Sequence, residues 1–240
     1  GLHEEQFRWR CLPNEFMIFA VACTDTMIVL GGEGGCVWIV RDAEEIRMFL
    51  PSTDTVTALH VSNHMLYVGT ASGKIWSRSL FTPVEWTLEY ESAFGFLAMN
   101  SAADRIVACG KEGHIVQRLV ADGEWRTVSL DGVNTDGLLL SAVTVTDTMV
   151  FVGTSRPSVI RISSAGVVLD ERTCQAPKVT ASADHLGMPE RVLRVIVNAD
   201  TIWLSGYFIP SPEARKGTSI HRSVDGGASY QRFAYLETFG

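Results

Sequence analysis

Four acidic residues stand at comparable points of the chain, each shortly before an apolar run: Glu15, Asp54, Asp136 and Glu190. Carboxylates gathered into one ring can bind a cation or a basic partner, or supply the general acid and general base of a hydrolytic reaction. Acidic residues before strands are also an ordinary feature of a chain with 27 Asp and Glu. We therefore keep a catalytic carboxylate cluster as an alternative and predict no catalytic residue as the main interpretation.

Other patterns that resemble chemical sites favour structural interpretations. His60 and His64 have the spacing of a helical metal pair, but they span the end of a predicted strand and its turn, where this spacing does not bring two rings together. The glycine-rich residues 31–35 precede a strand-like run rather than a helix, which favours a hairpin turn over a phosphate-binding loop. The five Cys show no paired spacing of the zinc type. We expect no metal site and no cofactor.

Composition narrows the class of protein and its partners. The chain has 240 residues, 46% of them hydrophobic, with 21 Gly, 8 Pro and many Val, Thr, Ile, Trp and Tyr, which favours β structure. A net charge of -7 argues against binding of nucleic acid or anionic membranes, and no apolar run approaches the roughly 20 residues of a spanning helix. Cys23, Cys36 and Cys109 lie in apolar runs typical of buried free thiols. We expect an intracellular soluble protein; a secreted or virion-associated one stays open.

A repeat of about 40 residues organises the chain. Five apolar runs end in glycine, and each follows another apolar run with a small residue at a nearly constant distance. The glycines are Gly31, Gly69, Gly110, Gly153 and Gly206, and the small residues are Ala20, Ala58, Ala98 and Ala142, with Val195 in their place in the fifth repeat. Two further strand-like runs follow each glycine. Four antiparallel strands at this spacing indicate the blades of a β-propeller, in which each blade covers the apolar face of its neighbour.

The sequence thus predicts one all-β propeller domain over residues 1–240, with five four-stranded blades near residues 14–52, 53–92, 93–132, 133–174 and 175–240. Residues 6–13 alternate like an additional outer strand. This segment either adds a strand to a complete ring or belongs to a sixth blade that the chain lacks. We expect a closed ring, because an open arc would expose two apolar blade faces.

One local motif carries a family resemblance. Residues 223–230 contain Ser223, Asp225, Gly227 and Tyr230 in the order of the Asp-box, or BNR repeat. The chain therefore resembles the sialidase-like and photosystem-assembly-factor-like propellers, in which the box forms the turn between the third and fourth strands of a blade. That resemblance implies a structural role for the box, in which the Asp accepts hydrogen bonds from turn amides and the aromatic ring packs between sheets. The Arg-Ile-Pro motif of sialidases is missing, which argues against that activity.

The places where the repeat is broken suggest the binding site. The connection after the second strand swells to residues 207–217 in the fifth blade, and the link into that blade, residues 174–190, is also long. Loops of both kinds emerge on one face of a propeller, where long loops commonly bind partners. The predicted contacts are Tyr207, Phe208, Ile209, Arg215, Lys216, His185 and Met188.

We predict a non-enzymatic scaffold for protein recognition or complex assembly. The alternative is a glycan-binding or glycan-cleaving propeller, adhesin-like or viral, that uses the top-face carboxylates Glu15, Asp54, Asp136 and Glu190. Five-bladed glycosidases of the arabinanase type gather three carboxylates at this end of the axis. Surface Trp or Tyr beside those carboxylates would favour sugar stacking.

Overall fold

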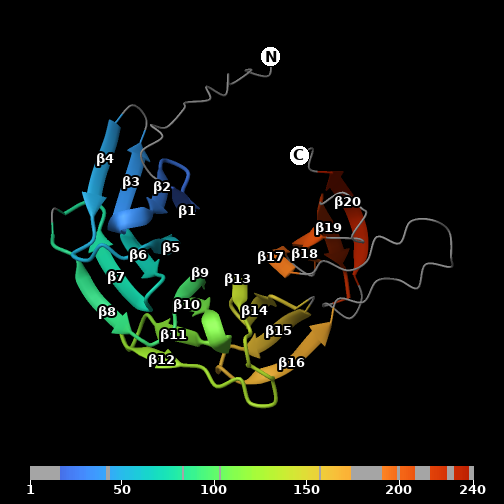
Figure 1. Cartoon of the computed structure of the whole chain (residues 1–240). Helices are drawn as coiled ribbons and strands as arrows, with labels where there is room; N and C mark the ends of the chain where they lie inside the picture. Colours follow the sequence, from blue (N-terminus) through green and yellow to red (C-terminus); the bar gives the residue numbers. More distant parts are fainter. Residues whose placement is uncertain are drawn as a thin grey trace.

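A computed structural model describes residues 17–41, 44–82, 84–102, 104–156, 158–173, 191–198, 201–208, 217–225 and 230–237. Its strands form five antiparallel sheets of four, which we call blades 1 to 5 (Figure 1). This arrangement confirms the prediction of an all-β propeller with five four-stranded blades.

The strands follow one another in each blade from the inner to the outer edge of the sheet. Blade 1 contains β1 (Ile18–Cys23), β2 (Ile28–Gly32), β3 (Cys36–Arg41) and β4 (Glu44–Phe49). Blade 2 contains β5 (Val56–Ser62), β6 (Met65–Thr70), β7 (Lys74–Ser79) and β8 (Thr87–Glu91). Blade 3 contains β9 (Phe96–Ala102), β10 (Arg105–Gly110), β11 (Ile115–Leu119) and β12 (Trp125–Thr127). Blade 4 contains β13 (Leu140–Val145), β14 (Met149–Thr154), β15 (Ser158–Ser163) and β16 (Val168–Thr173). Blade 5 contains β17 (Arg191–Asn198), β18 (Thr201–Phe208), β19 (Gly217–Ser223) and β20 (Gln231–Glu237).

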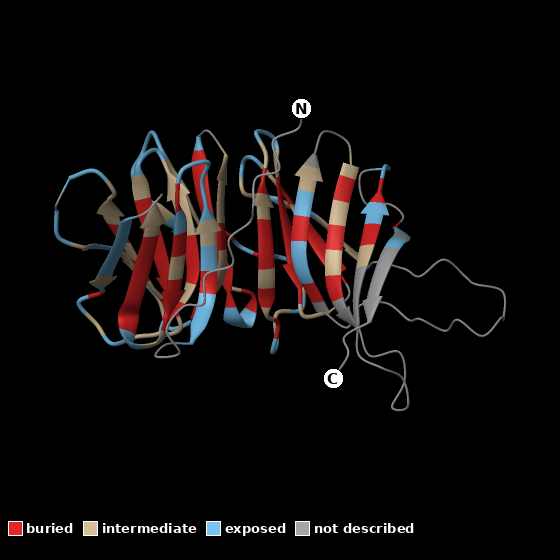
Figure 2. Ribbon diagram, turned by 90° about the horizontal axis from the view of Figure 1, so that it is seen from above, coloured by how far each residue is buried: buried red, intermediate tan, exposed pale blue. Residues whose placement is uncertain are grey.

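The second strands of blades 2, 3 and 4 are buried along almost their whole length because both of their faces are covered. All six residues of β10 are buried, and so are five of the six in β6 and in β14. Figure 2 shows buried residues along the middle strands of the blades and exposed residues on many of the outer strands and turns. Among the described residues, no helix has the length and apolar character needed to cross a membrane.

The core lies between blades rather than at the centre of the molecule. Four apolar clusters occupy the four junctions between successive blades. We call the side of a blade that meets the next blade its forward face and the side that meets the preceding blade its rear face. At the first junction, Gly31 on the forward face of blade 1 lies against Val56 and Leu59 on the rear face of blade 2. At the last junction, Gly153 on the forward face of blade 4 lies against Val192 and Val195 on the rear face of blade 5.

The strand register corrects two positions of the predicted repeat. Ala20, Ala58 and Ala142 pair with Gly31, Gly69 and Gly153, as the repeat suggests. In blade 3, however, Ala98 pairs with Cys109, and in blade 5 Arg194 pairs with Ser205. Gly110 and Gly206 therefore stand one residue further along, at a bulge, and the residue that replaces the inner alanine of blade 5 is Arg194 rather than Val195.

The prediction of a closed ring is wrong for this structure. β1 packs against β5, β5 against β9, β9 against β13 and β13 against β17. Figure 1 shows an arc, with blades 1 and 5 at its two ends and an opening between them. The five blades therefore do not complete a turn.

Candidate functional site

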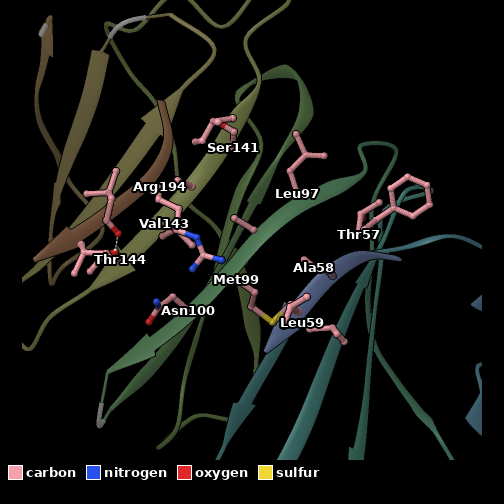
Figure 3. Close-up of a pocket in the computed structure, with 18 residues that line it drawn as sticks. Thr57, Ala58, Leu59, Leu97, Met99, Asn100, Ser141, Val143, Thr144 and Arg194 are labelled. Carbon is pink, nitrogen blue, oxygen red and sulfur yellow. Dashed lines mark hydrogen bonds between the residues drawn. The ribbon is translucent and has the colours of Figure 1, made fainter. Parts of the chain in front are cut away.

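The inner strands of all five blades line one cavity of about 310 Å³ on the concave side of the arc (Figure 3). Each of β1, β5, β9, β13 and β17 contributes three or four consecutive residues to its wall. We call it the axial cavity. Its position follows from the small residues of the inner strands, Ala20, Ala58, Ala98 and Ala142, which leave space where the sheets converge.

Three hydroxyls on the wall of this cavity connect neighbouring blades. The Thr57 hydroxyl donates a hydrogen bond to the carbonyl oxygen of Phe96 at 2.5 Å, from blade 2 to blade 3. The hydroxyls of Ser141 and Thr144 donate to the carbonyl oxygens of Val192 and Val195, from blade 4 to blade 5. These donors are already used in holding the arc together, so their role is structural.

Arg194 is the charged residue of the axial cavity. Its side chain is exposed and points into the cavity (Figure 3), at the position that alanine holds in the other four blades. It makes no ion pair or hydrogen bond with another described residue. A guanidinium offers five donors in a planar fork that matches a carboxylate or phosphate. The cavity can therefore hold an anionic group at this edge.

The carboxylates of the alternative hypothesis do not gather in the axial cavity as far as the structure describes them. Neither Asp54 nor Asp136 lines it, and Glu15 and Glu190 lie outside the described residues. Asp54 accepts hydrogen bonds from the hydroxyl of Ser72 and, at 3.2 Å, from its backbone amide. Partial burial acts to raise the pKa of Asp54, but hydrogen bonds from Ser72 and its neighbours outweigh it, and the pKa is lowered. Such a carboxylate stays ionised and braces a loop.

The predicted binding residues of blade 5 are only partly described. Tyr207 pairs with Arg191 and with Thr218, and Phe208 pairs with Gly217. Both aromatic residues thus belong to a strand, not to the loop in which the sequence placed them, because the hairpin ladder runs further than in the other blades. The remaining predicted contacts, Ile209, Arg215, Lys216, His185 and Met188, lie outside the described residues.

Of the Asp-box residues, Ser223 ends β19, and Asp225 and Tyr230 lie between β19 and β20. The Ser223 hydroxyl donates to the Asp225 carboxylate at 2.7 Å, and Tyr230 is buried in the junction between blades 4 and 5. Gly227 lies outside the described residues. Tyr230 contributes to the apolar core rather than to a surface site.

Histidine and cysteine side chains in the described part of the chain do not assemble a metal site. No group of three or more His, Cys, Asp or Glu there could hold a metal ion. His60 lies 2.7 Å from the Ser101 hydroxyl across the junction of blades 2 and 3, and burial lowers its pKa to about 4. Cys36 and Cys109 are buried free thiols, as expected, and burial raises the pKa of both. Cys23 is exposed, because it ends β1 beside a turn.

Comparisons with known proteins identify a fold and no family. No protein-family model and no curated protein sequence matches the chain. Solved structures do match the chain. The crystal structure of the computationally designed Ika8 protein matches with a TM-score of 0.63 and 14% identity, over 91% of this chain and 73% of that one. A chain of the Mitotic Checkpoint Complex matches with a TM-score of 0.68 and 13% identity, over 95% and 67%. These likenesses show the β-propeller fold alone.

Arg194 is the residue of the axial cavity that the sequence interpretation missed. A signal was present, since Arg194 interrupts an otherwise apolar run from Val192 to Val197. Aligning the repeat on glycine rather than on the hairpin shifted the fifth blade by one residue and assigned the axial position to Val195. Alignment on the turn residues that the sequence predicts between β17 and β18 would have found it.

Proposed function

We propose that the protein is a non-enzymatic scaffold for protein recognition or complex assembly that binds its partner through the long loops of blade 5. The fold supports a protein-interaction scaffold in general. The observation that carries the finer proposal is the length of the β17–β18 hairpin, whose two strands of eight residues are the longest described. The neighbouring β18–β19 ladder continues to the pair of Phe208 and Gly217, so the insertion between these strands starts further along than in the other blades.

The composition of the insertion supports recognition of a protein. Residues 209–216 combine Ile209 and two prolines with Arg215 and Lys216, directly after Tyr207 and Phe208. Aromatic and Arg side chains are enriched among residues that carry binding energy at protein interfaces. The prolines limit the conformations of the free loop, which lowers the entropy lost on binding. The link that carries His185 and Met188 is expected at the same end of the blade.

A glycan-binding or glycan-cleaving propeller is the competing function. It needs carboxylates at the axis that are free to contact a sugar. Asp54 is held by Ser72, and neither Asp54 nor Asp136 lines the axial cavity. These observations favour the scaffold over a carboxylate site at the axis.

The experiment replaces residues 209–216 with a short Gly-containing turn and compares the proteins captured from the native source by the intact chain and by the variant. We expect at least one captured protein to be lost while the melting temperature is unchanged, because the insertion lies outside the described core. The control variant carries Asp122→Ala and Glu124→Ala at the β11–β12 turn, at the opposite end of a blade. It should capture the same proteins as the intact chain.

Retained capture by the loop variant would contradict the proposal. A screen of the same material against glycans tests the competing function. Glycan binding that is lost with Asp54→Asn or Asp136→Asn, without any captured protein, would favour that function instead.

A further inference from the structure

The wall of the axial cavity contains polar groups that the fold does not use. Its polar side chains are those of Thr57, Asn100, Ser141, Thr144 and Arg194. The three hydroxyls donate to backbone carbonyl oxygens of a neighbouring blade. Asn100 and Arg194, by contrast, form no hydrogen bond or ion pair through their side chains within the part of the chain that the structure describes. An amide and a guanidinium are therefore available to a ligand in this cavity.

Arg194 determines the charge of the cavity. Among the described residues that line the wall, none is acidic and Arg194 alone is basic. Its side chain is exposed and points into the cavity (Figure 3). A charge in a concave site with apolar walls attracts counter-ions more strongly than the same charge on an open surface. In a chain of net charge -7, the axial cavity is thus a local site for an anion.

Packing does not explain why an arginine occupies this position. The residues at the same point of the inner strand in blades 1, 2 and 4 are Ala20, Ala58 and Ala142. An alanine would complete the β17–β18 ladder equally well, because the pairing of Arg194 with Ser205 uses backbone groups. An exposed charge without a protein partner adds little to stability. The side chain is therefore free to serve a ligand.

Most of the remaining wall is apolar. Phe19 of β1 is 51% exposed and Ile196 of β17 is 54% exposed, and Leu97 of β9 is half-buried. Contact with a ligand would remove apolar surface of these side chains from water, which favours binding. A wall with one cation and several accessible apolar side chains matches a molecule that has one anionic group and an apolar body.

We propose that the axial cavity binds a small monocarboxylate with an apolar body. The guanidinium of Arg194 holds the carboxylate in a bidentate pair, and the apolar side chains of the inner strands contact the body. The cavity volume of about 310 Å³ lies at the small end of the range of about 300 to 1,000 Å³ for ligand sites, which fits a small molecule. This site is separate from the blade 5 loops of the scaffold function.

The charge of the wall favours a carboxylate over a phosphate. A phosphate monoester carries about 1.5 to 2 negative charges at neutral pH. The wall offers one guanidinium and no second cation among the residues described. A carboxylate carries a single charge, which one guanidinium balances.

The experiment titrates the full isotope-labelled chain with hexanoate, acetate and hexanamide and follows its backbone amide NMR signals. We expect hexanoate to cause saturable shifts at inner-strand residues 97–100, 141–144 and 193–196, and none in the outer strand β16. Hexanoate should bind at least tenfold more tightly than acetate, because its longer chain removes more apolar surface from water. It should also bind at least tenfold more tightly than hexanamide, which lacks the charge.

Variants of Arg194 test its role in binding the carboxylate. Arg194→Gln should weaken hexanoate binding at least tenfold, and Arg194→Lys should weaken it less, because lysine keeps the charge but loses the planar fork. The melting temperature of both should be unchanged, since the Arg194 side chain bonds to no residue that the structure describes. The control Arg126→Gln removes an exposed arginine from the outer strand β12 and should bind hexanoate like the unaltered chain.

Other results overturn the proposal. These are the absence of saturable shifts, shifts outside the inner strands, or unchanged hexanoate binding by Arg194→Gln. Tighter binding of inorganic phosphate than of hexanoate would make this a phosphate site, and tighter binding of a tripeptide that ends in leucine would assign the carboxylate to a polypeptide terminus. The variant with the shortened 209–216 loop should bind hexanoate unchanged, so failure of the scaffold function and failure of this proposal are distinguishable.

Discussion

At the junction of blades 3 and 4, one buried arginine connects two turns that are distant in the sequence. Arg105 is 3% exposed; its guanidinium donates to the carbonyl oxygen of Ser164 at 2.6 Å and forms a bidentate pair with Asp104 at 2.8 and 2.9 Å. Hydrogen bonding to Arg105 is the main reason that the pKa of Asp104 is lowered. Arg105 therefore connects the start of β10 in blade 3 to the turn between β15 and β16 in blade 4.

Removal of this side chain should weaken the whole arc. We expect Arg105→Ala to lower the free energy of unfolding by about 2 to 3 kcal/mol, because the hydrogen bonds that its buried, charged guanidinium donates to Ser164 and Asp104 are lost. Urea denaturation measures the change. Arg126→Ala is the control, since the ion pairs of Arg126 with Asp122 and Glu124 are exposed, and a change within about 0.5 kcal/mol is expected. Equal effects of the two substitutions would contradict the assignment.

His60 makes stability depend on pH. Its folded pKa is about 4, below the value of about 6.5 for an unperturbed histidine. As the pH falls below 6.5, the unfolded chain takes up a proton that the folded chain does not, so stability should decrease between pH 6.5 and pH 4, by up to about 3 kcal/mol. Denaturation of the His60→Gln variant, in which Gln can still reach Ser101, measures the effect. Its free energies of unfolding at pH 7 and at pH 4.5 should differ less than those of the unaltered chain. An unchanged difference would show that His60 titrates normally.

At the scale of elements, the junctions depend on glycine where the next blade approaches closely. Gly31→Ala places a methyl group in contact with Val56, which cannot move because Leu59 and Leu66 surround it in the same cluster. We expect a loss of about 1 to 3 kcal/mol from overpacking. A double-mutant cycle measured by denaturation tests this contact. The variant that combines Gly31→Ala with Val56→Ala should be more stable, by at least about 0.5 kcal/mol, than the sum of the two single effects predicts. Additive effects would mean that Gly31 is required for another reason.

The strands and their grouping into blades could be predicted from the sequence, whereas two positions of the register between strands could not. Apolar second strands, glycine turns and hairpin residues such as Asn63 and His64, both with positive φ, are local signals, and they predicted the blades. The positions of Cys109 and Arg194 could not be read from glycine alone, because the bulge opposite each inner strand lets glycine stand at either of two adjacent positions. Pairing between strands decides between them, and pairing is not a local property.

At the scale of the whole molecule, stability should vary along the arc. Blade 3 is covered on both faces, whereas blades 1 and 5 are each covered on one. In a repeat protein each unit depends on its immediate neighbours. We expect amide hydrogen exchange to be slowest in β9 and β10 and faster in β1 and β2. Uniform protection would argue that both ends are already covered.

Ring closure could not have been predicted from the repeat. The number of blades follows from counting, but the angle between two blades depends on how side chains such as Val56 seat on Gly31 and how Leu140 and Val143 pack on Val107. An apolar rear face is also the same in sequence whether or not a blade covers it. Ile18 and Val21 have the pattern of Val56 and Leu59, and only the fold reveals the difference in their exposure.

The four junctions of the arc act mechanically in series. A small rotation at one of them turns every blade beyond it, so rotations at the junctions add up between blade 1 and blade 5. The hydroxyl of Thr57 and those of Ser141 and Thr144 span two of these junctions on the concave side, where they resist opening more than they resist closing. We therefore expect the mouth of the arc to be its most compliant dimension, because small rotations shared among the four junctions change its width without rearrangement of any one of them.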